Sequence, residues 1–295
     1  MSIINRRSFV AASAAAFASA SPIVKGNAAP DTSPLPTVRI GKQQVTRLII
    51  GGNPFSGNAH SEPLVYGSSL FKKYFTHEKV VETLQLAFQN GITTFLGRVD
   101  DNVIGFLKLY EKTSGRAIPW FAQTAKKPDQ GATRQEVLDN IRLARDNGAV
   151  ACYLQGVSAD YLVAEGRLRE IEEYLSFMTK LGMTVGIGAH ENRTVQETAR
   201  AGLRPEFYMK TINSIGYYSE NPGAVPNIMS KVSCPWIAFK VLAAGRIRPE
   251  EGFRYALDAG AEVLCVGMFD FQVDSNVALF RKLLQERKEL GVSGS

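Results

Sequence analysis

The sequence predicts an α/β protein, a TIM (β/α)8 barrel with an N-terminal β-hairpin. Three observations predict this fold. From Val38 onward, short apolar segments alternate with amphipathic stretches, and the pair recurs eight times before residue 290. The units are regular in size, as the units of a barrel are. The composition, 45% hydrophobic and 21% charged residues, is that of a globular protein rather than a disordered or collagen-like one. An open α/β sheet with the same alternation is the alternative.

A β-hairpin opens the predicted domain. Val38–Ile40 and Gln44–Thr46 are short segments joined across Gly41 and Lys42, a pattern typical of a hairpin. Eight apolar segments then have the length of buried parallel strands and are bounded by Gly, Pro or polar turn residues. The predicted strands are Leu48–Gly51, Thr93–Leu96, Trp120–Gln123, Ala151–Leu154, Thr184–Gly188, Phe207–Lys210, Ile237–Lys240 and Val263–Gly267.

Four of the segments between these strands carry clear helix signals. Glu78–Gln89 gathers its apolar residues near one face and ends at an Asn-Gly pair. Glu136–Asn147 and Leu168–Leu181 each stop before a glycine, and Pro249–Ala259 begins with proline and stops at Gly260. Proline in the first turn and glycine after the last one are typical helix boundaries. A strand followed by a helix, repeated in this way, predicts one barrel domain over residues 38–290.

The N-terminus resembles a twin-arginine export signal. Asn5-Arg6-Arg7-Ser8-Phe9-Val10 precedes a short Ala-rich stretch that ends at Ala20, too short to span a bilayer. Cleavage is expected after Ala18-Ser19-Ala20 or near Ala28 and Ala29. We expect residues 1–29 to be a signal and processing region and residues 30–37 a Pro/Ser-rich linker. The resemblance implies the twin-arginine translocase as a partner and a periplasmic or secreted location, whereas a plain basic tail is the alternative.

Charge and cysteine spacing exclude several classes of function. The formal net charge is +6, but the basic residues are scattered and do not alternate with aromatic residues. Nucleic acid is therefore not an expected partner. The three cysteines and three histidines show no spacing of the C-x-x-C or H-x-x-H type, so no metal site is predicted. No apolar run of 18 residues follows the signal, so no stable membrane span is expected. The predicted substrate is a small molecule.

Polar residues lie at the C-terminal ends of most of the predicted strands, where TIM barrels carry their chemistry. The residues predicted to bind substrate are Asn53, Arg98, Asp100, Lys126, Gln155, Asn213 and Asp270. Lys210 and Lys240 each end an apolar strand directly, a placement that a solvated lysine does not need. His190 follows the fifth strand. These three residues are the predicted catalytic groups.

Small residues follow the seventh and eighth predicted strands. Ala243-Ala244-Gly245 and Cys265-Val266-Gly267-Met268 lie where TIM barrels often expose backbone N–H groups to a phosphate. Gly245, Gly267 and Met268 are therefore predicted to bind a cofactor, whose identity the residues do not fix.

The order of these features resembles the aldo/keto reductase superfamily. The hairpin leading into Arg47–Gly52, the segment His77–Phe95 and the segment Trp236–Gly245 carry the likeness, which covers nearly all of residues 38–285. The resemblance implies a barrel with its floor closed by the hairpin, and NADP as cofactor. The family's tetrad is Asp, Tyr, Lys and His.

The tetrad is degraded in this chain. Leu96 stands at the aspartate position, no tyrosine follows at the expected spacing, and Gln155 aligns with the histidine. The lysine aligns with Lys126. A reductase mechanism would need a replacement acid, for which Tyr153, His190 and Lys126 are the candidates.

A second, local resemblance is to class I aldolases. Lys210-Thr211 ends the sixth strand, where those enzymes carry a Schiff-base lysine, and Lys240 ends the seventh. A second cation nearby lowers the pKa of an amine and so favours its nucleophilic form. The two lysines could also clamp a carboxylate or a phosphate.

Three functions follow from these residues. The leading expectation is an exported enzyme that acts on a small sugar-like or carbonyl substrate by non-redox, lyase- or isomerase-type chemistry, with a lysine as the reacting group. The alternatives are a divergent NADP-dependent oxidoreductase of the aldo/keto reductase type and a ligand-binding barrel without catalysis.

Overall fold

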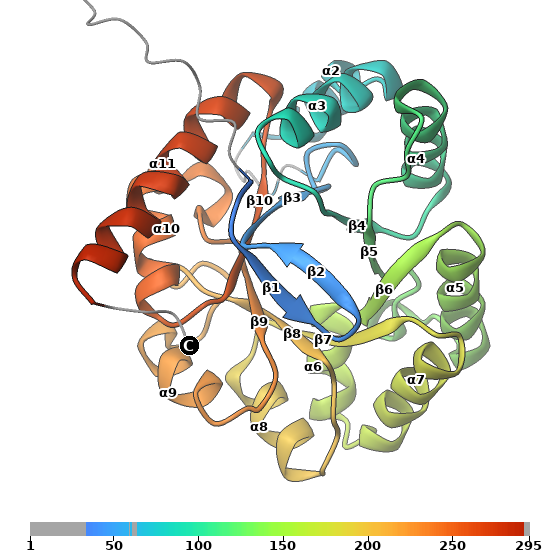
Figure 1. The fold of residues 1–295 in the computed structure, drawn as a ribbon. Helices are drawn as coiled ribbons and strands as arrows, with labels where there is room; N and C mark the ends of the chain where they lie inside the picture. Colours follow the sequence, from blue (N-terminus) through green and yellow to red (C-terminus); the bar gives the residue numbers. More distant parts are fainter. Residues whose placement is uncertain (1–33, 59, 61–63, 292–295) are drawn as a thin grey trace, which may run out of the picture. The chain divides into compact units, whose positions relative to one another are not determined.

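The computed structural model describes residues 34–58, 60 and 64–291, which fall within a unit that begins at Thr32. Eight parallel strands close into a barrel in the order β3-β4-β5-β6-β7-β8-β9-β10, and β10 pairs with β3 to complete the circle. Helices surround this barrel (Figure 1). The predicted TIM-barrel fold is confirmed. Residues 1–29, the expected export signal, lie outside the described residues, so export and location stay predictions.

The N-terminal hairpin covers one end of the barrel. Strands β1 (Thr37–Ile40) and β2 (Gln43–Thr46) pair antiparallel and lie across the barrel in Figure 1. Ile40 and Val45 are fully buried and belong to the same apolar cluster as the inward-facing side chains of the barrel. The hairpin therefore plugs the N-terminal end and leaves the other end as the place for a site.

The barrel strands are short, and six of the eight lie within one residue of the predicted bounds. They are β3 (Leu48–Gly51), β4 (Phe95–Arg98), β5 (Trp120–Gln123), β6 (Ala149–Leu154), β7 (Thr184–Ala189), β8 (Phe207–Thr211), β9 (Trp236–Phe239) and β10 (Val263–Gly267). β4 begins two residues later than predicted, and β6 begins two residues earlier. β9 ends one residue before Lys240, and that difference shapes the site.

Helices follow the strands and pack against their outer faces. Those of eight residues or more are α2 (Gly67–Tyr74), α3 (His77–Gln89), α4 (Asp101–Ser114), α5 (Arg134–Asp146), α6 (Gly156–Ala164), α7 (Leu168–Lys180), α8 (Asn192–Arg200), α10 (Pro249–Asp258) and α11 (Asp270–Glu289). Shorter elements are η1 (Pro128–Gln130), η2 (Pro222–Ala224), α9 (Val225–Met229) and η3 (Ala243–Gly245). None of the described helices is long and apolar enough to cross a membrane.

The local sequence accounts for the helix ends. Asp100 accepts a hydrogen bond from the backbone N–H of Val103 at the start of α4. Thr133 and Glu136 form a capping box at the start of α5. Gly115 ends α4 in the left-handed conformation, which glycine adopts without steric cost. These caps fix the residue at which each helix begins or ends, and so set the length of the loops that join helices and strands.

Candidate active site at the mouth of the barrel

A cavity of about 240 Å³ opens at the C-terminal end of the barrel. Its wall includes residues from seven of the eight barrel strands or their immediate ends, and from the loops that follow β3, β9 and β10. Leu96, Tyr153, Met209 and Cys265 form part of an apolar floor. This volume lies below the roughly 300–1,000 Å³ of most small-molecule pockets. The site therefore fits a small ligand.

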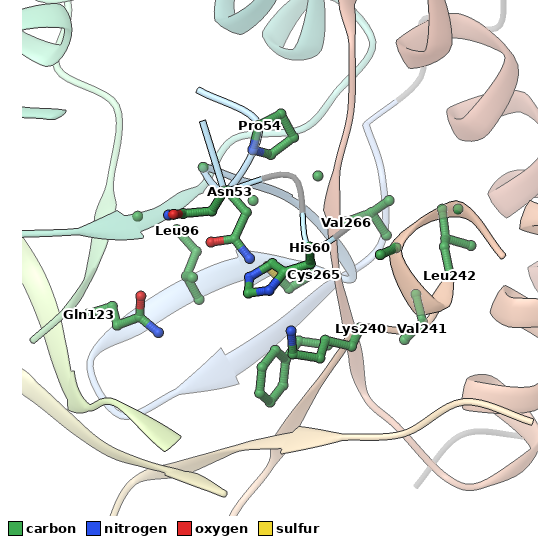
Figure 2. A pocket seen from close by; sticks show the side chains of 18 of the residues that line it. Asn53, Pro54, His60, Leu96, Gln123, Lys240, Val241, Leu242, Cys265 and Val266 are labelled. Carbon is green, nitrogen blue, oxygen red and sulfur yellow. The ribbon is translucent and has the colours of Figure 1, made fainter. Parts of the chain in front are cut away.

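Lys240 reaches the cavity because the backbone turns at this residue. In β9, Ile237 and Phe239 pack with the inward-facing cluster, whereas Trp236 and Ala238 pack with the outer one. Strict alternation would point the next side chain outward. Lys240 instead has a φ of 56°, a left-handed conformation that costs a residue with a side chain roughly 1–2 kcal/mol. The turn places its side chain among the residues that line the cavity (Figure 2).

The same loop holds two more residues with positive φ. Ala243 and Ala244 have φ values of 47° and 57°, and Gly245 follows with 84°. Buried Asn213 supports this loop, because its amide donates hydrogen bonds to the carbonyls of Lys240 and Tyr217. Strained backbone that the surrounding structure holds in place is concentrated at functional sites. The loop after β9 is therefore a candidate functional element.

The ammonium of Lys240 contacts two aromatic rings. Its Nζ lies 4.3 Å from the ring centre of Tyr218 and 5.7 Å from that of Tyr217. Burial, and then the positive charge of Arg246, lower the pKa of Lys240 to about 8. No hydrogen bond or ion pair joins this Nζ to another of the described residues. A fraction of the amine is therefore neutral near pH 8 and can act as a nucleophile.

Three other polar side chains point into the same space. Figure 2 shows the amides of Asn53 and Gln123 and the ring of His60 converging with Lys240. Neither amide forms a side-chain hydrogen bond to another described residue. Tyr153 extends from β6 into the floor, and burial raises its pKa well above the ordinary value. Its neutral hydroxyl likewise has no hydrogen-bond partner within the described part of the chain, so a ligand oxygen could accept from it.

His60 lies at the solvent-exposed rim of the cavity. The Tyr217 hydroxyl donates to the His60 carbonyl (2.7 Å), and the His60 ring packs edge-on against Tyr218. Desolvation by neighbouring protein atoms, and then the charges of Lys240 and Lys127, lower the pKa of His60 to about 4, although the residue keeps contact with solvent. The imidazole is therefore neutral at pH 7 and can accept a proton.

Lys210 lies outside the cavity. Phe207 and Met209 of β8 face the barrel interior, so Lys210 faces the helix layer. It is fully buried, and its Nζ donates to the carbonyls of His190 (2.6 Å) and Thr211 (3.3 Å). Burial lowers its pKa to about 8 despite the opposing charge of Asp160. The predicted convergence of Lys210 and Lys240 on one mouth does not occur, and the geometry gives Lys210 a supporting place behind the site.

His190 also lies behind the wall of the cavity. Its ring packs against Phe239, which lines the cavity, and its Nδ1 lies 2.6 Å from the Thr211 hydroxyl. Burial, and then the charges of Lys240 and Lys210, lower the pKa of His190 to about 3. Buried Asp160 accepts hydrogen bonds from the backbone N–H groups of His190 and Glu191. His190 is thus a neutral, fixed histidine that does not line the cavity.

Of the seven predicted substrate-binding residues, only Asn53 lines the cavity. Arg98 and Asp100 form an ion pair with each other (2.8 Å). Lys126 is exposed on the loop after β5. Gln155 accepts a hydrogen bond from the Ser158 N–H and caps α6. Side chains at the start of a loop also serve as helix caps or as surface charges, and these structural uses account for the placement of these residues.

The remaining two predicted binding residues have structural partners. Asn213 is fully buried and holds the backbone of Tyr217 and Lys240. Asp270, the first residue of α11, accepts hydrogen bonds from the Tyr74 hydroxyl (2.5 Å) and from Lys79 Nζ (2.9 Å). Its carboxylate therefore ties α11 to α2 and α3 rather than facing a ligand.

Among the predicted cofactor-binding residues, Gly245 and Gly267 line the cavity and Met268 is fully buried. A Cβ on Gly267 would lie 2.8 Å from Cδ of Pro54, so this glycine permits close packing of the loops after β3 and β10. No group of three or more His, Cys, Asp or Glu within the described ranges could hold a metal ion.

His60 and Gln123 line the cavity but are not among the predicted catalytic or binding residues. Gln123 ends β5 and could have been chosen by the rule that selected Lys210 and Lys240. His60 belongs to an irregular loop, where no periodicity indicates the direction of a side chain.

The pH dependence of stability should report the burial of Lys240. Its folded pKa of about 8 lies below the ordinary value near 10.4 in an unfolded chain. Unfolding therefore takes up a proton between these pH values, so stability is lower below pH 8 and rises toward pH 10.4. At pH 7 the free energy of unfolding of Lys240→Met is expected to exceed that of wild type by up to about 3 kcal/mol, so the variant should unfold at a higher temperature. Thermal unfolding from pH 7 to 10.5 measures the difference, which should shrink as pH rises; a constant difference would contradict the lowered pKa.

Comparison with solved structures shows a likeness of fold. A protein described as an aldo-keto reductase from Pseudomonas aeruginosa is 15% identical, with a TM-score of 0.61 over 84% of this chain and 95% of that one. The glycerol dehydrogenase of Gluconobacter oxydans is 11% identical, with a TM-score of 0.56 over 86% and 94%. An aldolase gives 14% identity and a TM-score of 0.51 over 74% and 93%. No protein-family model and no curated protein matches the chain. The structural neighbours are aldo/keto reductase-like and other TIM-barrel enzymes.

Proposed function

We propose that the protein is an enzyme whose Lys240 forms a Schiff base with the carbonyl of a small substrate and catalyses a non-redox, lyase- or isomerase-type reaction. The observation that carries this proposal is the Lys240 Nζ in the cavity, with a pKa lowered to about 8. The strained backbone at Lys240 supports it, because strain of this kind is retained where it positions a functional group. The likeness of fold to TIM-barrel enzymes is consistent with a catalytic role.

The first step joins the amine to the carbonyl carbon. The neutral Nζ attacks, a C–N bond forms, and the oxygen becomes the hydroxyl of a carbinolamine. Loss of that hydroxyl and of one proton from nitrogen, as water, gives the imine, and protonation gives the iminium. The Tyr153 hydroxyl in the cavity floor is suited to donate to the substrate oxygen.

The iminium then withdraws electrons from the neighbouring carbon. A bond from that carbon to hydrogen or to another carbon can break, with the electron pair moving toward nitrogen. The neutral imidazole of His60 is suited to accept the released proton, because it faces Lys240 across the cavity (Figure 2). The amides of Asn53 and Gln123 are suited to hold hydroxyl or carbonyl oxygens of the substrate.

Borohydride trapping tests this proposal. Wild-type protein is incubated with a panel of small keto and aldehyde compounds and reduced with borohydride, which converts an imine into a stable secondary amine. We expect at least one compound to add its mass, less that of one oxygen atom, to the peptide that contains Lys240, because imine formation loses water and reduction adds two hydrogens. Modification at Lys210 instead, or at surface lysines alone, would contradict the proposal.

A second candidate is a divergent NADP-dependent oxidoreductase, favoured by the aldo/keto reductase-like fold and by Tyr153 as an acid in the cavity floor. The residues at the start of α11 fit a phosphorylated dinucleotide poorly. The first side chain of that helix, Asp270, is an anion held by Lys79, and it would repel a phosphate placed there. Quenching of intrinsic fluorescence by millimolar NADPH would favour this candidate. Ligand binding without trapping or turnover would favour a non-catalytic barrel.

A further inference from the structure

The charges around the cavity are unbalanced. None of the described residues that line it is an aspartate or a glutamate, whereas Lys240 contributes a cation and His60 a neutral imidazole. A buried cation without an anionic partner is costly. A ligand with a negative charge would provide that partner.

Lys210, a buried lysine that does not line the cavity, provides a comparison for Lys240. The negative charges of Asp160, Glu191 and Glu220 all act to raise its pKa against the effect of burial. For Lys240, burial and the positive charge of Arg246 both lower the pKa, and no carboxylate acts in the opposite direction. Nearby carboxylates therefore offset the effect of burial on Lys210, whereas no carboxylate does so for Lys240 in the cavity.

The positive field extends across the mouth. Lys240 and Lys127 each lower the pKa of His60 and of His190. Two carboxylates that follow barrel strands have cationic partners of their own: Asp100 pairs with Arg98, and Asp270 pairs with Lys79. The field therefore remains available to an incoming ligand.

Two neutral donors complete the arrangement. The side-chain amides of Asn53 and Gln123 face the same space as Lys240 (Figure 2). An amide N–H and an ammonium together suit an oxyanion, which accepts several hydrogen bonds at once. The cavity volume of about 240 Å³ leaves room only for a small molecule.

We propose that the substrate of this site is a small anionic carbonyl compound, in which a carboxylate or a phosphate lies close to the carbonyl that reacts with Lys240. The inference rests on the proposed Schiff-base function, because it assigns the charge of the same substrate. The anion would be held by the positive field of Lys127 and by the amide donors of Asn53 and Gln123, and by the positive charge of the iminium once Lys240 has reacted.

Two matched pairs of probes test the charge. One pair is 2-oxobutyrate and butanone, and the other is dihydroxyacetone phosphate and dihydroxyacetone. The half-saturating concentration for borohydride trapping at Lys240 is measured for each compound. We expect the anionic member of at least one pair to saturate at a concentration roughly 10- to 100-fold lower, the gain expected from one charge-assisted hydrogen bond. The pair with the larger ratio identifies the carboxylate or the phosphate as the source of the charge.

A reversed charge in the cavity provides the variant test. Gln123→Glu adds a carboxylate of nearly the same shape at the wall and is expected to reduce the ratio within the preferred pair to about three or less, because it neutralises the field. Gln135→Glu makes the same change on the exposed face of α5 and should leave the ratio as in wild type. An unchanged ratio in Gln123→Glu would contradict the placement of the anion.

Calorimetry with 2-hydroxybutyrate, which has no carbonyl, and with the uncharged 2-butanol separates this inference from the proposed function. Equal trapping of charged and neutral probes overturns the anionic substrate and leaves the Schiff base in place. No trapping, together with binding of 2-hydroxybutyrate but not of 2-butanol, overturns the Schiff base and supports the anionic ligand. No trapping and no binding overturn both.

Discussion

Lys240→Met is expected to abolish borohydride trapping and to lower turnover of the trapped substrate at least about 1,000-fold, as the removal of a covalent nucleophile does. Methionine keeps much of the volume and flexibility of the lysine side chain but has no amine. The substitution also removes the cation that contacts Tyr217 and Tyr218. Single-turnover kinetics and trapping yields on the same preparation measure both effects.

Lys210→Met is the matched comparison. Lys210 is fully buried and lies near the end of β8, but it does not line the cavity. We expect Lys210→Met to retain trapping at Lys240, because among the described residues the Lys210 Nζ donates hydrogen bonds only to the backbone carbonyls of His190 and Thr211. If Lys210→Met lost trapping while Lys240→Met kept it, the assignment of the nucleophile would be wrong. Circular dichroism of each variant establishes that the fold is retained.

The architecture could be predicted from the sequence because the barrel repeats one local pattern. Apolar strands such as Trp120–Gln123 occur with the bounds expected from their composition. Helix ends marked by Thr133 or Gly115 are decided within a few residues of chain. β4 begins later than expected, at Phe95, which is the first residue of this segment that pairs in register with both β3 and β5. Such pairing depends on neighbouring strands and is not written in the local sequence.

The site was harder to predict because the direction of a side chain depends on single backbone angles. Lys210 and Lys240 look equivalent in the sequence, and each comes at the end of an apolar strand. Regular alternation turns Lys210 toward the helices, whereas a positive φ turns Lys240 into the cavity. Nothing in the sequence around Lys240 requires that angle, since the residue is not a glycine. The conformation follows from the loop as a whole, with Asn213 bonded to its carbonyl.

Polar residues at strand ends also have structural uses that compete with ligand binding. Asp100 and Gln155 accept hydrogen bonds from the first turns of α4 and α6, and Asp270 joins three helices. The rule that barrel chemistry lies at strand ends places all three near the mouth, but it cannot tell a helix cap from a ligand contact. Only contacts in three dimensions separate the two.

The glycines that let β6 and β7 approach each other are another feature on which the mouth depends. Gly188 lies near the end of β7, two residues before His190, and Gly156 begins α6 after β6. A Cβ on Gly188 would lie 2.6 Å from the backbone N of Gly156 and 2.8 Å from the carbonyl oxygen of Leu154. Both are backbone atoms of a paired strand and of the helix start that follows it, so neither can move away as the end of a flexible side chain could.

Gly188→Ala is therefore expected to destabilise the protein by about 3 kcal/mol or more, at the upper end of the range for overpacking. For a domain of this size the loss corresponds to a fall in Tm of roughly 6–12 °C. Gly223→Ala is the control, because a Cβ there meets only Asn221 Oδ1, at 3.8 Å, and the φ of Gly223 is not positive. Thermal unfolding of both variants beside wild type measures the effect. Equal Tm values for the two variants would show that β6 and β7 can separate at this point, and the fixed position of His190 behind the cavity would then need another explanation.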